Sequence, residues 1–195
     1  MSFRVLVVPE DPTLNGYILK PLCEHILDTA GKPRASITIL ADPKVSGYAD
    51  AKAKLLSEIP ERWGHMDLIL FICDADGKDR SAEFSELERK LLERRHSMQL
   101  ICCAAVQELE AWLLAGHVEK LRINGWNWSS VRAEVSVKET YFHSFLEEYG
   151  DPAVPGGGRR RLMDEALANY AGMKQRCPEI LELEDRVREH IATLE

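Results

Sequence analysis

Apolar and polar positions along the first 116 residues follow a pattern typical of strands separated by helices. Runs of β-branched and apolar residues predict four strands, at residues 3–8, 35–41, 67–73 and 98–106. Segments with apolar residues at helical spacing predict helices near residues 14–31, 47–58, 80–95 and 107–121. Because the strand runs are apolar at consecutive positions, we expect an α/β fold whose four-stranded, mostly parallel sheet carries helices on both faces.

The alternation stops after about residue 117. The remaining sequence predicts a turn at 124–128, a short helix at 137–150, a Pro/Gly-rich loop at 151–158 and two amphipathic helices, near 160–175 and 179–194. A segment of this length rarely builds a core alone. We therefore expect an α/β domain over residues 1–116 and a helical appendage over residues 117–195 packed on it.

Composition indicates a globular protein: of 195 residues, 45% are hydrophobic and 29% are charged. The net charge of −7 gives no overall footprint of nucleic-acid binding, although it leaves room for a local basic groove. No apolar run approaches the ~18–20 residues of a membrane span, and the N-terminus does not read as a signal peptide. Three of the five cysteines (Cys73, Cys102 and Cys103) lie in apolar runs, which favours reduced thiols in a cytoplasmic protein.

Acidic residues follow three of the predicted strands. Glu10 comes after the first strand, Asp74 and Asp76 after the third, and Glu108 and Glu110 after the fourth. Open parallel sheets bind ligands beyond the carboxyl ends of their strands. Carboxylates at that edge predict a site for Mg²⁺ or Mn²⁺, because such ions need oxygen ligands and offset clustered negative charge. The alternative is that the two aspartates only form an Asx turn before the next helix.

The glutamate after strand one and the Asp-x-Asp after strand three resemble the signature of the Toprim domain. The sequence looks closest to small Toprim-like proteins and is distantly similar to the overcoming-lysogenisation-defect nucleases of phage defence. "QELEAWLLAG" at 107–116 matches an acidic stretch that follows the last strand in those proteins. The resemblance covers roughly residues 3–116, and the tail resembles these relatives more weakly.

This resemblance implies a hydrolase that cleaves phosphodiesters with Mg²⁺ or Mn²⁺. Asp74 and Asp76 would hold the metal, and Glu10 would ligate it or act as general acid or base. Glu110 would complete the coordination shell, and Lys138 would stabilise charge in the transition state. The implied partners are a nucleic-acid substrate, DNA or RNA, and an ATPase. The oligomeric state stays open, a homodimer included.

The sequence also departs from the family pattern. Relatives commonly carry a glycine directly after the glutamate of strand one and a further acid within the next turn. Here Asp11 stands in the glycine position, and Leu14 and Asn15 stand where the acid would be. The number of metal ions that the site would bind, one or two, therefore stays open.

Helical geometry separates Glu108 from Glu110, because residues two apart on a helix point in different directions. We favour Glu110 as the ligand; the alternative is a solvated first turn with acidic residues near its N-terminus. Lys78 and Arg80 would steer a phosphate or lie in a solvated turn.

Two further groups have two interpretations each. The arginines at 159–161 would contact phosphate or nucleic acid from the Gly-rich loop, or simply begin a surface helix. Trp126 and Trp128 would stack on bases, or pack the appendage onto the sheet. The histidines show no zinc spacing.

Two other functions compete with a metal-dependent nuclease. A non-catalytic Toprim-like module would bind a partner or nucleotide after losing part of its site, which agrees with the missing acid after Glu10. A phosphatase of the haloacid-hydrolase type also uses Asp-x-Asp, but places it after the first strand and follows it with threonine or valine. Here the motif follows the third strand and continues "GKD".

Overall fold

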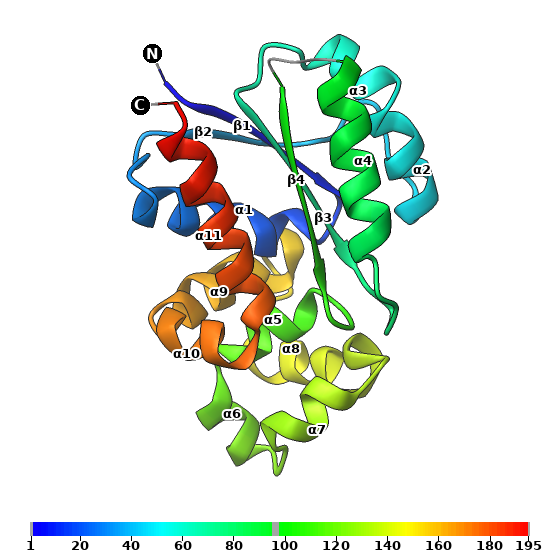
Figure 1. Ribbon diagram of the computed structural model, residues 1–195. Helices are drawn as coiled ribbons and strands as arrows, with labels where there is room; N and C mark the ends of the chain where they lie inside the picture. Colours follow the sequence, from blue (N-terminus) through cyan, green and yellow to red (C-terminus); the bar gives the residue numbers. More distant parts are fainter. Residues whose placement is uncertain (1, 95–97, 195) are drawn as a thin grey trace.

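Four strands form an all-parallel sheet in the computed structural model, which describes residues 2–94 and 98–194. The strand order is β2-β1-β3-β4 (Figure 1). The bounds of the strands are β1 Arg4–Pro9, β2 Ser36–Ile39, β3 Leu68–Asp74 and β4 Gln99–Ala105. The predicted α/β fold with a four-stranded parallel sheet is confirmed.

Successive residues of β3 are buried on opposite faces of the sheet. Leu68, Leu70 and Ile72 belong to one apolar cluster. Ile69 and Phe71 belong to the other. This period of two, with both faces covered, explains why the strand reads as a continuous apolar run.

Helices cover both faces of the sheet (Figure 1). One face carries α2 Gly47–Leu55, α3 Glu58–Arg62 and α4 Ser81–Arg94. The other face carries α1 Gly16–Thr29 and α11 Pro178–Ala192. The remaining elements lie at or beyond the carboxyl edge: α5 Glu110–Ala115, α6 Val118–Ile123, α7 Trp128–Ala133, a π-helical turn η1 Lys138–Phe142, α8 His143–Tyr149, a 3₁₀ turn η2 Pro155–Gly158, α9 Arg159–Leu167 and α10 Tyr170–Arg176.

Two predicted helices in the α/β part are each divided. The segment 47–58 ends at Leu55 and a new helix begins at Glu58, because Pro60 has no N–H to continue the first helix. The segment 107–121 breaks between α5 and α6 at Gly116. A Cβ there would lie 2.4 Å from the Ala166 Cβ, so this glycine lets α5 approach α9 closely. The helix predicted near 80–95 is α4, and residue 95 lies outside the described residues.

The C-terminal part also differs from the prediction in two places. The helix expected near 160–175 divides into α9 and α10 at Asn169, a residue type that competes with helical hydrogen bonds. An additional helix, α7, follows the predicted turn. Asn127 caps it, because its side chain accepts a hydrogen bond from the Ser130 N–H at 2.9 Å.

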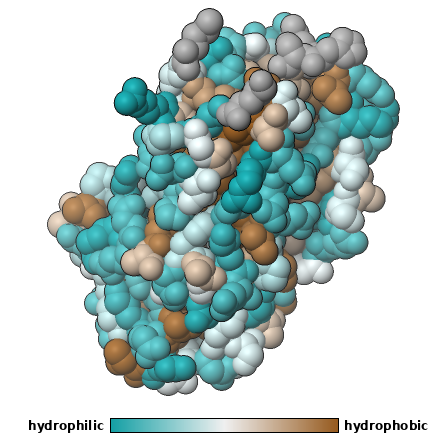
Figure 2. All heavy atoms as spheres, turned by 60° about the vertical axis from the view of Figure 1, so that its left-hand side comes forward, coloured by the Kyte–Doolittle hydropathy of each residue, from teal (hydrophilic) through white to brown (hydrophobic). Residues whose placement is uncertain are grey.

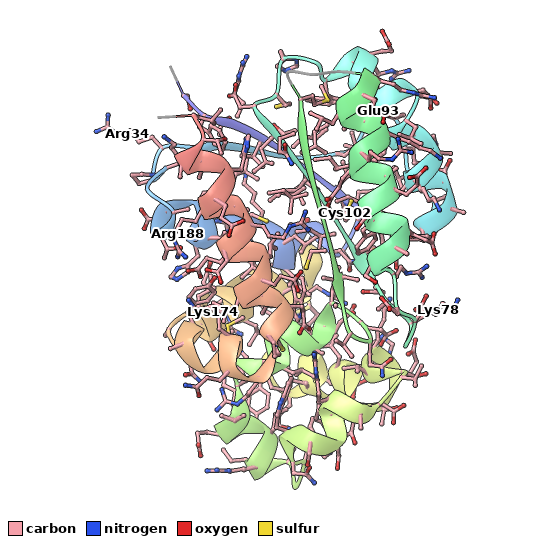
Figure 3. The ribbon with its side chains drawn as sticks, viewed as in Figure 1. Arg34, Lys78, Glu93, Cys102, Lys174 and Arg188 are labelled. Atoms are coloured by element: carbon pink, nitrogen blue, oxygen red, sulfur yellow. The ribbon has the colours of Figure 1, made fainter. Side chains whose placement is uncertain are left out.

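β4 is an edge strand whose outer backbone groups are capped by an ion pair. Glu88 of α4 accepts from the Cys102 N–H at 2.7 Å, and Arg186 of α11 donates to the Cys102 carbonyl at 2.9 Å. The two side chains pair at 2.8 Å. Figure 3 shows Cys102 on β4 between the two helices. The pair supplies the acceptor and donor that a fifth strand would supply, which protects an edge otherwise open to strand addition.

The surface in Figure 2 is mostly hydrophilic, with small, separate hydrophobic areas. None of the helices in the described ranges is long and apolar enough to cross a membrane. All five cysteines are free thiols and buried. A reduced state therefore agrees with their packing as core residues.

The C-terminal helices share one apolar core with the sheet. Val5 and Leu70 of the sheet belong to the same cluster as Leu162 of α9 and Val187 of α11. We expect residues 117–195, expressed alone, to unfold without a cooperative transition, because they would lose this apolar face. Circular dichroism during urea titration measures this. A sharp transition of the isolated fragment would show an independent domain instead.

The edge cap predicts a local loss of stability. Glu88→Ala leaves the Cys102 N–H without its acceptor and Arg186 without its carboxylate, so we expect unfolding free energy to fall by about 1–3 kcal/mol. Glu86→Ala is the control, because Glu86 pairs with Arg89 and Lys90 on the exposed face of the same helix; that change should cost clearly less than Glu88→Ala. Equal losses in the two variants would contradict the capping role.

Candidate functional site

The candidate site lies where the strand order reverses. From β1 the chain moves to β2 on one side and later returns to place β3 on the other. Parallel α/β sheets bind ligands beyond the carboxyl ends of the strands at such a reversal, which here are the ends of β1 and β3. Pro9 pairs with Ile72, so Glu10 follows β1 beside the last residues of β3. Asp74 is the final residue of β3.

Glu10 and Asp74 share a hydrogen bond between their carboxyl groups. Burial, followed by the charges of Glu10 and Glu110, raises the pKa of Asp74 to about 8. Burial also raises the pKa of Glu10. Both shifts favour a proton shared by this pair of carboxyl groups, and the Asp74 Oδ1 accepts from the Leu109 N–H at 2.8 Å.

Glu110 is the buried member of the group, whereas Glu10 and Asp74 are partly buried. It opens α5 and is 2% exposed. Its charge acts on Asp74. Burial raises its own pKa, and the charges of Lys138 and Arg159 oppose this. Glu10 and Glu110 thus both act on Asp74, and within the described residues no cation forms an ion pair with any of the three.

Asp76 takes a different direction from Asp74. Its φ of 50° and that of Gly77, 69°, form a tight left-handed turn after β3. The Asp76 carboxylate, 56% exposed, pairs with the Arg80 guanidinium at 3.5 Å. Its charge still raises the pKa of Glu10. The second aspartate of the motif is therefore near the carboxylate group but bound to an arginine.

Arg80 is buried. A solvated turn was one of the two interpretations that the sequence allowed for it. Its Cζ lies 3.8 Å from the centre of the Tyr48 ring, and its Nε has no hydrogen-bond partner. The Gly47 N–H donates to the Glu10 carbonyl at 3.1 Å, which places Tyr48 beside the site. Nothing in the local sequence of Tyr48 indicated this role, because the contact depends on packing. Lys78 points outward from the loop (Figure 3).

Glu108 and Glu110 have different contacts, because Glu108 precedes α5 and Glu110 is its first residue. The Glu108 Oε2 accepts from the backbone N–H of Lys138 at 2.7 Å, which attaches η1 to the start of α5. This bond brings Lys138 close enough for its charge to act on both glutamates. The structure therefore places Lys138 at the site although it is distant in sequence. Trp126 packs edge-on against Tyr141, with ring centres 5.3 Å apart.

The described ranges contain no group of three or more His, Cys, Asp or Glu residues already arranged to hold a metal ion. The contacts above give the reason, since Asp76 is paired with Arg80 and Glu108 with the Lys138 backbone. Glu10 and Asp74 are hydrogen-bonded to each other.

A cavity of about 620 Å³ lies between α4, β4 and α11. It touches the outside of the loop after β3 at Gly77, Lys78 and Arg80, but Glu10, Asp74 and Glu110 do not line it. We therefore place the candidate chemistry at the carboxylate group and not in this cavity.

Comparisons with models of known protein families, with curated proteins and with solved structures find no match to this chain.

The raised pKa of Asp74 predicts a pH-dependent stability. The unfolded carboxyl titrates near 3.8 and the folded one at about 8, so the folded state binds more protons between these values. Stability must fall as pH rises through that window. Asp74→Asn removes this loss. The unfolding free energy of the variant minus that of the original protein should therefore increase by about 2–4 kcal/mol as pH rises from about 5 to about 9.

Urea denaturation at several pH values measures the difference. Asp79→Asn is the control, because the Ser81 hydroxyl and N–H lower the pKa of that exposed aspartate and its titration lies below the window. A difference for Asp74→Asn that does not change with pH would contradict a shared proton.

Proposed function

We propose that this protein is a Mg²⁺- or Mn²⁺-dependent nuclease, or a related enzyme that cleaves phosphodiesters, of the Toprim type. The observation that carries the proposal is the group formed by the partly buried Glu10 and Asp74 and the buried Glu110 at the reversal of strand order. Burying acids together is costly unless they serve a ligand that needs them.

The chemistry of these donors fits a hard divalent cation. All are carboxylate oxygens, which Mg²⁺ and Mn²⁺ prefer, and the local excess of negative charge would be offset by the ion. Glu10, Asp74 and Glu110 would hold it. Asp76 would join them after leaving Arg80, with which it pairs at 3.5 Å.

The residues of the chain have distinct parts in this proposal. Asp74 and Glu110 would hold the cation as carboxylates, and Glu10 would either ligate it as well or accept and return a proton at the attacking or leaving oxygen. Lys138, next to Glu110, offers a positive charge to the anionic transition state. When bound, a divalent cation supplies further charge stabilisation of that state.

The substrate class in this proposal is the phosphodiester of a nucleic acid, DNA or RNA. A defence-system effector working with an ATPase partner agrees with the sequence resemblance. A cytoplasmic location agrees with the five free, buried thiols.

One observation favours a second candidate, a non-catalytic module of the same type. The Arg80–Asp76 pair occupies part of the acidic motif, as expected if the site no longer binds a cation. Metal binding separates the two candidates.

Thermal unfolding with and without Mg²⁺ or Mn²⁺ tests the proposal. A cation that binds the folded state alone raises its stability, by about 2.7 kcal/mol at a hundredfold excess over Kd. Asp74→Asn combined with Asp76→Asn should abolish this rise, whereas Asp79→Asn on the same loop should keep it. Glu10→Gln should reduce cleavage at least about a hundredfold.

Cleavage is measured on single-stranded DNA, double-stranded DNA and structured RNA. A cation response that persists in the double variant would place the ions elsewhere and contradict the proposed site. Cation binding without cleavage of any of these substrates would favour the non-catalytic module.

A further inference from the structure

The three arginines after the Gly-rich loop have different environments. Arg160 and Arg161 each have side chains 52% exposed. Arg160 pairs with Glu24 at 3.4 Å, and Arg161 pairs with Glu165. Arg159 is only 7% exposed. The sequence pattern treats the three alike, and the fold buries one of them.

The loop conformation directs Arg159 inward. Gly156, Gly157 and Gly158 have φ values of 74°, 63° and 83°, a region that other residues rarely adopt. A Cβ at Gly156 would lie 2.5 Å from the Tyr17 ring, and one at Gly158 would lie 2.8 Å from the Asp151 nitrogen. Three consecutive glycines thus fix the backbone where Arg159 begins α9.

The Arg159 guanidinium has unused hydrogen-bonding capacity. Its Nη1 donates to the Gly156 carbonyl at 2.8 Å, and its Cζ lies 5.3 Å from the centre of the Phe142 ring. Its buried Nε has no partner. Within the described part of the chain, no carboxylate forms an ion pair with it. A guanidinium carries five N–H donors, so most of them remain available.

Arg159 also lies close enough to the candidate site to interact with it electrostatically. The carboxylates whose charges act on it are Glu110 and Asp11. Lys138 acts on Glu110 as well. Two cations that form no ion pair with a described residue therefore act on the buried Glu110, one from η1 and one from α9.

We propose that Arg159 binds an oxygen-rich anion of the phosphate class at the edge of the carboxylate group, and so positions the phosphoryl group of a substrate. Planar guanidinium groups match phosphate oxygens in two-point hydrogen bonding, and their partial burial strengthens the contact. Arg160 and Arg161 contribute only surface ion pairs. This inference rests on the proposed function, because it assigns a substrate contact of the same site.

Binding of inorganic phosphate tests the inference directly. Phosphate is titrated with and without Mg²⁺ at matched ionic strength, and affinity is read from thermal unfolding. Arg159→Gln should weaken phosphate binding about tenfold or more. Arg160→Gln removes the same charge from the neighbouring residue and should change affinity less than about twofold.

Arg159→Lys keeps the charge but loses the planar fork, so its affinity should lie below that of the original protein. If Arg159→Gln does not fold, the phosphate affinity of Arg159→Lys tests the inference instead. Equal phosphate affinity in the original protein and Arg159→Lys would then overturn the inference, as would equal effects of Arg159→Gln and Arg160→Gln.

The cation response and cleavage are measured in the same variants. Loss of phosphate affinity in Arg159→Gln with an intact cation response supports the anion contact. A protein that neither binds cations nor cleaves, yet binds phosphate through Arg159, would contradict the nuclease proposal and leave the anion contact standing. Unchanged phosphate affinity in Arg159→Gln, together with normal cation binding and cleavage, would contradict the anion contact and leave the nuclease proposal standing.

Discussion

Because β1 and β3 pair in parallel at the centre of the sheet, the residues that follow both strands must meet at one edge. The strands are apolar on both faces, so that edge is the first place where polar groups can appear. Glu10 and Asp74 meet there under helices that exclude much of the water. The parallel pairing therefore determines both the closeness of the acids and the high energy of their charged forms.

The surrounding residues relieve this energy only in part. Leu109 donates its N–H to Asp74, and the pair keeps a proton. The nearest cations serve other groups, Arg80 by pairing with Asp76 and Arg159 by bonding to a loop carbonyl. This division of charge is typical of a functional site more than of a core selected for stability alone.

Local periodicity was enough to predict the strands, the two-sided cover of the sheet and the edge where the acids lie. Glu110 was favoured over Glu108 from the apolar residues that follow it, and Glu110 is the more buried of the two. The direction of Asp76 could not be predicted, because it depends on a positive φ and on an arginine held against Tyr48. The divided helices and the burial of Arg159 depend in the same way on contacts between segments distant in sequence.

The proton between Glu10 and Asp74 has a consequence for any ligand of these oxygens. A cation and the proton would compete for the same atoms, so occupancy would depend on the ratio of their concentrations. Acidification would then empty the site at constant metal concentration. Each binding event would also release protons to the buffer, and the heat of binding would change with the ionisation enthalpy of that buffer. The pair of carboxyl groups would in this way make the site a sensor of acidity as well as of metal.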